Sequence, residues 1–448
     1  MESPAVEVAL PAVEVALPAA RASRRQARRL IAAAAVGNAL EFYDFTVYSY
    51  FALLIGRLFF PVGSAFGELM LAVASFGVGF VTRPLGGIVI GIYADRAGRR
   101  SAMILTLLLM ALGTAMIAAA PTYAQAGLAA PVILVLARLL QGFASGGEVG
   151  ASTTLLIEQA PPHRRGFYAS FQFSSQGLAA LAGALTGAVL NATLSAPQLD
   201  NWGWRVPFVI GTLFVPLGYW LRRGIDEAHR PAASGSGSSA GDAPAPLPLA
   251  AVLRRHRRAL FAGLGLTIGG TATHYIIVFY MAIYGVRTLH LPAWIAMLAG
   301  CVAGMALMLV SPLGGALADR IGRKPVAGWS RLALTLAIYP AFVALNRWPG
   351  AASLLGAIAV LSVVHALYCG ATAPMLGELF PRAVRATGGA LVYSLGVAIF
   401  GGFAQFIVTW LIAATGDPTA PAWYAIACGM LSFAALASIE ERAGKRLD

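Results

Sequence analysis

The chain has 448 residues, of which 58% are hydrophobic and only 11% are charged. The mean hydropathy of +0.73 is far above that of a water-soluble fold, which excludes an ordinary soluble enzyme. The net charge of +13 does not indicate a nucleic-acid-binding protein, because the basic residues form short clusters between apolar runs and no continuous stripe. We therefore expect a polytopic membrane protein.

The N-terminus is expected to be a mobile cytoplasmic tail over residues 1–28. It repeats the sequence PAVEVAL at Pro4–Leu10 and Pro11–Leu17, and a proline at the start of each repeat prevents a long helix. A secretory signal carries its positive charges before the apolar stretch, whereas acidic, proline-broken sequence comes first here. We therefore expect the tail to remain uncleaved.

Apolar runs of about 20 residues, the length that spans a bilayer, follow one another from Leu30 onward. They predict a first bundle of six helices over residues 29–222. Its spans are expected near Leu30–Gly56, Gly67–Tyr93, Ser101–Ala120, Pro131–Ile157, Phe167–Leu194 and Trp204–Leu221. The polar segment over residues 223–257 contains SGSGSSAGDAPAP and cannot bury enough apolar surface to fold, so it is predicted to be a cytoplasmic linker.

The second half predicts another six-helix bundle over residues 258–440, followed by a cytoplasmic tail over 441–448. Its spans are expected near Ala259–Val286, Pro292–Leu317, Val326–Leu345, Ala351–Gly377, Gly388–Ala414 and Ala422–Ile439. Most of the 32 Lys and Arg residues fall in the tails and in alternate loops, and such residues resist translocation. We therefore predict an all-α inner-membrane protein of about 12 transmembrane helices, with both termini cytoplasmic.

Two signatures recur at nearly the same offset in the two halves. The first is DRAGR at Asp95–Arg99, which returns as DRIGR at Asp319–Arg323. The second is the spacing of Glu158, Pro161 and Arg165, which returns as Glu378, Pro381 and Arg385. The repeat predicts two pseudo-symmetric halves, an arrangement that is typical of transporters with a solute site between them. The surrounding loops, GIYADRAGRR and GALADRIGRK, resemble the signature of the major facilitator superfamily, which implies the major facilitator fold.

These repeated charges are candidates for a cytoplasmic gate. An acid at a helix end can meet neighbouring arginines and helix termini and so hold one face of the protein closed. The predicted gate residues are Asp95, Arg96, Arg99, Glu158 and Arg165 in the first half and Asp319, Arg320, Arg323, Glu378 and Arg385 in the second.

Three further segments resemble the metabolite:proton symporter family: GNALEFYDF at Gly37–Phe45, RLLQGFASGGEVG at Arg138–Gly150 and WGWRVPF at Trp202–Phe208. Members of that family carry citrate, tricarballylate, 2-oxoglutarate, shikimate, proline or betaine. The segment RRGFYASFQFSSQ at Arg164–Gln176 looks most like the citrate and tricarballylate branch. The resemblance implies secondary active, proton-coupled symport of a small organic acid by alternating access.

Charged residues inside apolar spans are the best functional candidates, because each costs about 2.5–3.5 kcal/mol on insertion. In the first span, Asn38, Glu41, Asp44 and Tyr48 follow helical spacings that broadly share one side. We predict that Glu41 and Asp44 carry protons, because a buried carboxylate near an arginine can change its proton occupancy when substrate arrives.

The fourth span carries Arg138, Gln141, Ser145 and Glu148 at spacings that face one direction. By depth, Arg138 matches Asp44, so we predict an ion pair between them, with a purely structural pair as the alternative. Glu148 is a further candidate for proton coupling.

Recognition of an anionic solute calls for fixed cations and for amide or hydroxyl donors. Arg138 is the strongest candidate, because a guanidinium binds a carboxylate through two parallel hydrogen bonds. The predicted substrate-binding residues are Asn38, Arg138, Gln141, Gln172, Gln176, Thr271, His274 and Tyr275. Arg83 is a candidate for a second carboxylate ligand or a gate residue, whereas Arg331 is expected to extend back towards the cytoplasm.

No catalytic residue, cofactor or metal site is expected. The sequence has no GxxxxGK[ST] phosphate loop and no HExxH spacing, and its three cysteines lie in apolar segments. The expected partners are a small organic anion, protons and the lipid bilayer, with no nucleic acid and with function as a monomer. Transport of another metabolite such as 2-oxoglutarate, shikimate, proline or betaine, expulsion of a drug-like compound, and a non-transporting solute sensor remain as alternatives.

Overall fold

The computed structural model describes residues 35–97, 99–146, 156–157, 160–223, 256–381 and 385–444. These residues are almost entirely helical, and no strand occurs among them. The predicted tail over residues 1–28 lies outside the described residues, as does most of the predicted linker. The proposed domain boundaries therefore remain predictions.

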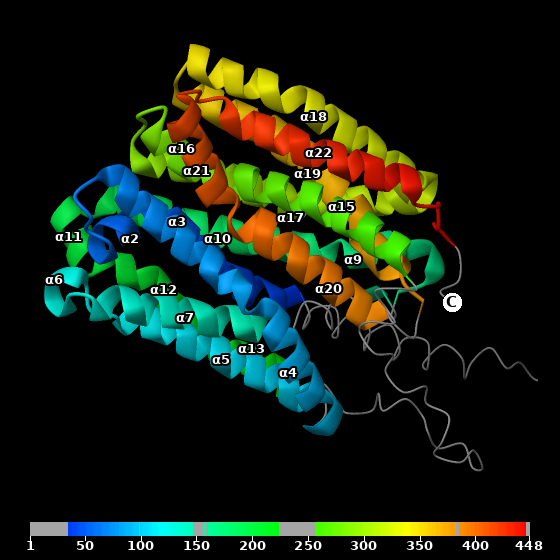
Figure 1. Ribbon diagram of the computed structural model, residues 1–448, viewed down its shortest axis with the longest axis horizontal. Coiled ribbons are helices and arrows are strands. Elements are labelled where there is room, and N and C mark those ends of the chain that lie inside the picture. The colour runs from blue at the N-terminus through cyan, green and yellow to red at the C-terminus, as the bar shows by residue number, and fades with distance from the viewer. Residues whose placement is uncertain are drawn as a thin grey trace, which may run out of the picture.

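Helices of the first half lie side by side along the long axis of the molecule (Figure 1). The first helix covers residues 35–50 and continues after a turn at Phe51. The next elements are α2 (Ala52–Phe59), α3 (Ala65–Val81), α4 (Arg83–Ala97), α5 (Arg99–Ala119), α6 (Tyr123–Ala126), α7 (Ala129–Gly146), η1 (Pro162–Arg164), α9 (Arg165–Ala169), α10 (Phe171–Thr193), α11 (Ala196–Asn201), η2 (Gly203–Arg205), α12 (Val206–Leu213) and α13 (Val215–Arg223).

The second half contains long helices, two of which are interrupted by π-helical segments, η3 and η4. Its elements are α15 (Arg257–His274), η3 (Tyr275–Tyr280), α16 (Met281–Arg287), α17 (Ala293–Ile321), α18 (Arg323–Arg347), α19 (Ala351–Glu378), α20 (Arg385–Val397), η4 (Ala398–Gly402), α21 (Ala404–Thr415) and α22 (Ala420–Ser438). π-helical turns often occur at functional sites, so η3 and η4 are candidate positions for such a site.

Ten helical segments among the described residues are long and apolar enough to span a bilayer. The helical stretches over residues 35–59 and 206–223 occupy the places of the first and sixth predicted spans. Large apolar side chains such as Leu85, Phe261 and Leu336 are exposed on the outside of the bundle, where lipid would cover them. The predicted all-α membrane architecture is confirmed.

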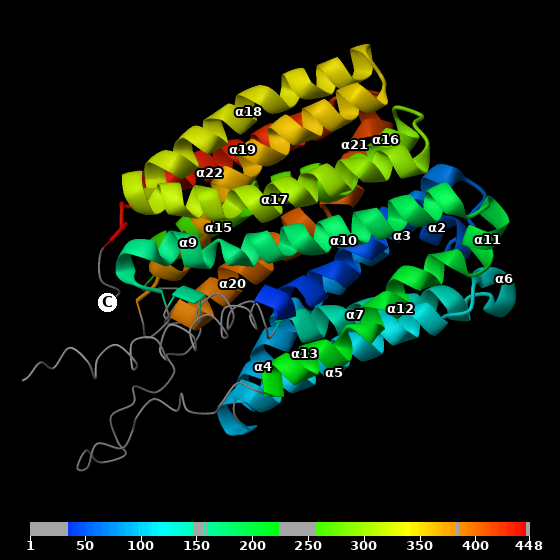
Figure 2. The ribbon, with the colours of Figure 1, turned by 180° about the vertical axis from the view of Figure 1, so that it is seen from behind.

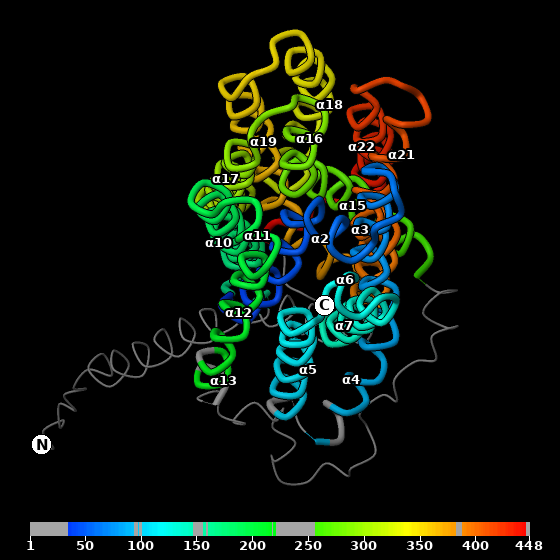
Figure 3. Tube along the Cα trace, turned by 90° about the vertical axis from the view of Figure 1, so that its left-hand side faces the viewer, coloured from blue at the N-terminus to red at the C-terminus, as the bar shows by residue number. Residues whose placement is uncertain are grey.

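The two halves form two groups of helices, seen end-on in Figure 3. The first helix lies in the interior, because residues 41–52 are all buried. Its Tyr50 hydroxyl donates to the carbonyl of Val278 in η3 at 2.8 Å, and Gln405 of α21 donates to Ser49 at 2.6 Å. The first helix is thus hydrogen-bonded to two helices of the other half.

Helices α10 and α17 also join the two halves, and they run side by side in Figure 2. Glycines permit this contact, because a Cβ placed on Gly304 would lie 2.5 Å from the backbone nitrogen of Leu181 and 2.7 Å from the carbonyl oxygen of Gly177. Small residues at such a crossing let two transmembrane helices approach closely, which maximises van der Waals contact.

Replacing Gly304 with alanine is therefore expected to destabilise the protein by about 1–3 kcal/mol, the usual cost of overpacking. The matched control is Gly356→Ala in α19, where an added Cβ would meet no atom within 4 Å. Thermal unfolding in detergent should show a lowered midpoint for the first variant only. Equal midpoints for the two variants would contradict the close packing of α10 on α17.

Candidate functional site

The polar residues of the first helix contact four different helices. Asn38 donates to Ser175 of α10 at 2.7 Å and accepts from Gln172 at 2.7 Å. The remaining bonds join Glu41 to Ser145 of α7, Asp44 to Thr114 of α5, and Tyr48 to Ser75 of α3. The four residues spread over about 120° of the helix surface, because each three-residue step falls about 60° short of a full turn, and they therefore reach different neighbouring helices.

The predicted ion pair between Asp44 and Arg138 does not form among the described residues. Two side chains stand between them: Thr114 donates to Asp44, and Gln141 donates to Thr114 at 3.0 Å. Arg138 in turn donates to Gln141 at 2.8 Å. A continuous chain of hydrogen bonds therefore links the carboxylate to the guanidinium through a hydroxyl and an amide.

Both carboxylates of the first helix line one small cavity inside the first half. Helices α5, α7 and α12 complete its wall, and its lining includes Glu41, Asp44, Thr114 and Ser145. The cavity has room for about one water molecule. Gly211 of α12 closes it tightly, because a Cβ there would lie 2.6 Å from a carboxylate oxygen of Asp44. The third predicted proton carrier, Glu148, lies outside the described residues.

Arg83 and Arg138 lie on helices that pack backbone to backbone. A Cβ on Gly142 of α7 would lie 1.4 Å from the carbonyl oxygen of Gly79, and one on Gly146 would lie 1.9 Å from that of Arg83. Only glycine fits at such positions. The helix that carries Arg83 is interrupted at Thr82, between α3 and α4 and two residues before Pro84, and the Thr82 hydroxyl donates to the carbonyl of Leu139 at 2.7 Å.

Both arginines are fully buried, with exposures of 1% for Arg83 and 0% for Arg138. Aromatic rings cover their guanidinium groups. The Cζ atom of Arg83 lies 4.1 Å from the ring centre of Phe80 and 4.8 Å from that of Phe45. The Cζ atom of Arg138 lies 4.7 Å from the same Phe45 ring and 4.4 Å from the ring of Tyr48. Cation–π attraction of about 2 kcal/mol per desolvated contact offsets part of the cost of burying these charges.

Most nitrogens of these guanidinium groups lack acceptors among the described residues. No acceptor there makes a hydrogen bond to Nε, Nη1 or Nη2 of Arg83, although the Tyr393 hydroxyl lies close to this guanidinium, and none bonds to Nε or Nη2 of Arg138. An unsatisfied buried donor costs about 1–3 kcal/mol, and more when it is charged. The arrangement therefore favours an anionic ligand that accepts several hydrogen bonds.

The second half contributes Tyr275 to this region. Its ring lies 5.8 Å from Phe80 and 6.1 Å from Phe76, both on α3, and 5.7 Å from the adjacent His274 ring. The aromatic cluster around the arginines is thus shared between the two halves. The other predicted substrate residues, Gln176 and Thr271, are buried.

The expectation that Arg331 extends back towards the cytoplasm is wrong. Its side chain is 1% exposed and lies over the ring of Tyr368, with Cζ 3.8 Å from the ring centre. Nη1 of Arg331 donates to Thr273 at 2.9 Å. The ring and the hydroxyl compensate part of the charge inside the second half.

Three predicted gate residues meet where α17, α18 and α19 end or begin. Asp319 accepts hydrogen bonds of 2.8 Å from the backbone nitrogens of both Gly166 and Phe167, at the start of α9 in the other half. Arg323 forms an ion pair with Glu378 and lies 3.8 Å from Asp319. These contacts join the two halves at one end of the molecule, which we call the Asp319 end and predict to be held closed by them.

The remaining gate residues divide into two groups. Arg165 lies near Asp319 and belongs to the same charge cluster, whereas Arg320 is the next residue in the chain after Asp319. Glu158 and the side chains of Asp95, Arg96, Arg99 and Arg385 lie outside the described parts of the chain. The gate roles of all ten residues remain predictions.

Replacing Asp319 with asparagine is expected to weaken the closed Asp319 end. The variant loses the charge at a helix N-terminus and one of two strong acceptors, which removes about 1.5–3 kcal/mol and shifts the equilibrium towards opening about 10-fold to 100-fold. Spin labels at positions 163 and 321 should report a longer and broader distance distribution in this variant. An unchanged distribution would contradict a gating contact.

The aromatic rings around the arginines were not predicted from the sequence. Phe45, Phe76 and Phe80 are ordinary apolar residues of membrane spans, and 10% of the chain is aromatic, so their identity alone carries no signal. Only the packing of the first helix against α3 and α7 brings them to Arg83 and Arg138.

Comparison with known proteins agrees with this architecture. The model of the family described as "Sugar (and other) transporter" matches residues 30–227 and 238–448. The chain is 38% identical over 399 residues to a citrate-proton symporter of Klebsiella pneumoniae, with 88% of each protein covered. It is 35% identical to an alpha-ketoglutarate permease of Escherichia coli (strain K12), over 90% of this chain and 91% of that protein.

Among solved structures, a D-xylose-proton symporter superposes with a TM-score of 0.74 at 20% identity, over 94% of this chain and 99% of that one. At that identity the likeness concerns the fold, and it confirms the major facilitator architecture that the repeated DRxGR loops predict. The family match and the similarity to transporters over most of the chain together show to which family the protein belongs. The chain is a multi-pass membrane protein that belongs to the sugar (and other) transporter family of the major facilitator superfamily.

Proposed function

We propose that this protein is a proton-coupled symporter of a small organic anion with at least two carboxylates, such as citrate or tricarballylate. The observation that supports this most is the pair of buried guanidinium groups, Arg83 and Arg138, five of whose six nitrogens have no hydrogen-bond acceptor among the described residues. One carboxylate bound to each arginine would satisfy these donors and neutralise both charges. A zwitterion with one carboxylate would satisfy only one of them.

Proton coupling is assigned to Asp44 and Glu41, which line the same cavity. The hydrogen-bond chain through Thr114 and Gln141 gives Asp44 a physical connection to Arg138. When a carboxylate binds Arg138, it competes with Gln141 for hydrogen bonds from the guanidinium. The hydrogen-bond chain can then rearrange as far as Asp44. Binding of substrate and of a proton then depend on each other reciprocally.

Similarity to named transporters supports an anionic substrate. The relatives described as a citrate-proton symporter and as an alpha-ketoglutarate permease both act on carboxylates. A proline/betaine transporter of Salmonella typhimurium is 29% identical, over 94% of this chain. The free donors of Arg83 and Arg138, which find no acceptor among the described residues, favour the carboxylate substrates over the zwitterionic ones.

Purified protein in proteoliposomes tests this function directly. With acid outside, labelled citrate should accumulate above its external concentration, and a protonophore should abolish the accumulation. Labelled betaine should not accumulate. Uptake of betaine without uptake of citrate, tricarballylate or 2-oxoglutarate would refute the proposal, and binding of citrate without any flux would favour a solute sensor.

We further propose that the Asp319 end faces the cytoplasm, that both termini lie on that side of the inner membrane, and that one chain transports alone. The C-terminal helix α22 ends at this end of the molecule (Figure 1). A C-terminal fluorescent-protein fusion should therefore fluoresce, and a C-terminal alkaline phosphatase fusion should be inactive. The reverse result would place the Asp319 end outside.

A further inference from the structure

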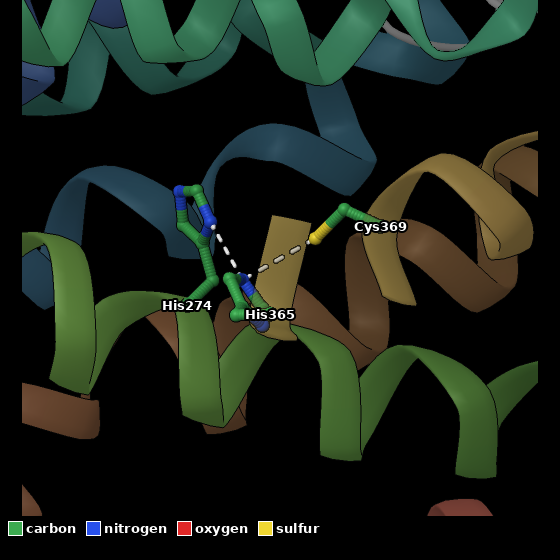
Figure 4. Close-up of side chains that lie close together, drawn as sticks. All are labelled: His274, His365 and Cys369. Carbon is green, nitrogen blue, oxygen red and sulfur yellow. Dashed lines mark hydrogen bonds between the residues drawn. The ribbon is translucent and has the colours of Figure 1, made fainter. Parts of the chain in front are cut away.

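Three potential metal ligands converge inside the second half, although the sequence alone predicts no metal site there. They are His274 at the end of α15, and His365 and Cys369 one turn apart on α19 (Figure 4). Nδ1 of His274 lies 3.3 Å from Nε2 of His365, and Sγ of Cys369 lies 3.3 Å from the same nitrogen. All three ligand atoms lie within 4.8 Å of one another.

This geometry suits a bound metal ion. Metal–nitrogen distances of about 2.0–2.1 Å and metal–sulfur distances of about 2.3 Å place ligand atoms roughly 3.3–3.8 Å apart. Cys369 and His365 are four residues apart, so they face the same side of one helix. The side chains are 5%, 1% and 2% exposed for His274, His365 and Cys369, so a bound ion would be shielded from water.

The cluster is poorly satisfied by hydrogen bonds alone. Nε2 of His365 lies within hydrogen-bond distance of both the Cys369 thiol and the His274 imidazole. A single ring nitrogen cannot form a full hydrogen bond with each of them. The two nitrogens that converge, Nδ1 of His274 and Nε2 of His365, have only each other and the Cys369 thiol as hydrogen-bond partners among the described residues. A bound ion would replace these weak contacts with direct ligand bonds.

The positive charge of Arg331 next to the cluster favours a monovalent ion over a divalent one. Arg331 lies over the ring of Tyr368, the neighbour of Cys369, and it donates to Thr273, the neighbour of His274. A divalent ion bound to one thiolate would leave a net positive charge beside this buried guanidinium. A monovalent ion and a thiolate are together neutral, and nitrogen and sulfur ligands suit a soft ion.

We propose that His274, His365 and Cys369 form a binding site for a soft monovalent cation of the Cu⁺ or Ag⁺ type. The ion takes the place of the Cys369 thiol proton, which leaves to the solvent, while both imidazoles bind as neutral ligands. The bound ion would join α15 to α19 next to Tyr275, a residue of the second half whose ring contacts the aromatic cluster around the arginines.

Titration of the purified full-length protein with Ag⁺ tests the site without any transport measurement, so the result does not depend on the proposed function. One Ag⁺ per chain should bind to the wild type and to Cys301→Ser, whose cysteine lies on α17. Binding should weaken at least about 100-fold in Cys369→Ser and in His365→Asn. Removing a residue that binds the ion directly lowers the metal affinity at least as much as removing a residue that only supports a ligand.

A second measurement needs no variant. X-ray absorption of the wild type loaded anaerobically with Cu⁺ should show two nitrogen neighbours and one sulfur neighbour. Unchanged affinity in both ligand variants, or a coordination shell of sulfur alone, would overturn the site. Tighter binding of Zn²⁺ than of Cu⁺ would overturn its assignment to a monovalent ion.

Discussion

Citrate uptake by the Arg138→Gln variant is expected to fall about 30-fold to 3,000-fold below that of the wild type. Removing one partner of a buried, hydrogen-bonded charge pair costs about 2–5 kcal/mol, and each 1.4 kcal/mol is a factor of ten. Glutamine keeps a donor but loses the charge and the parallel pair of hydrogen bonds. Arg83→Gln should behave in the same way, because most nitrogens of both guanidinium groups lack acceptors in the part of the chain that the structure describes.

Two further variants make this result interpretable. Arg287→Gln is the matched control, since this arginine is exposed at the end of α16, and its uptake should equal that of the wild type. Arg138→Lys keeps the positive charge but loses the planar guanidinium with its two parallel donors, so this variant should retain an intermediate rate of citrate uptake. Initial rates over a range of citrate concentrations provide the measurement. Wild-type rates in both Arg83→Gln and Arg138→Gln would remove the basis of the proposed substrate site.

The Asp44→Asn variant is expected to lose all proton-driven accumulation of citrate while it still exchanges internal for external citrate. Asparagine resembles a permanently protonated aspartate, and its carbonyl oxygen can still accept the hydrogen bond from Thr114. The hydrogen-bond chain to Arg138 would therefore persist, but no proton could be taken up or released at this position. The accumulation ratio should fall to about one at any imposed pH gradient.

Counterflow and gradient-driven uptake should be measured on the same proteoliposomes. Asp200→Asn is the control, because Asp200 forms a surface ion pair with Arg57 far from the cavity, and such pairs contribute little. Glu41→Gln distinguishes the two carboxylates: if it alone uncouples transport, Glu41 is the proton carrier. Full uphill accumulation by Asp44→Asn would contradict our assignment of Asp44.

Much of the candidate site follows from the sequence. Charged residues within apolar runs are so costly that Glu41, Asp44 and Arg138 stand out from the apolar residues around them. Residue spacing on one helix also correctly places Gln141 next to Arg138. Pairing between helices is harder to predict, since depth along two helices does not determine their rotation. The expected pair of Asp44 with Arg138 is accordingly replaced by a chain through Thr114, a residue of a third helix.

The sequence by itself determined the membrane environment, through apolar length and charge distribution, and the two-fold repeat, while its local motifs carry the resemblance to a transporter family. Only the tertiary structure decided which buried groups meet. The aromatic rings around Arg83, the position of Arg331 over Tyr368 and the cluster of His274 with His365 and Cys369 all bring together residues far apart in the chain. Such contacts depend on how helices are rotated and how closely glycines let them approach, and neither leaves a periodic signal in the sequence.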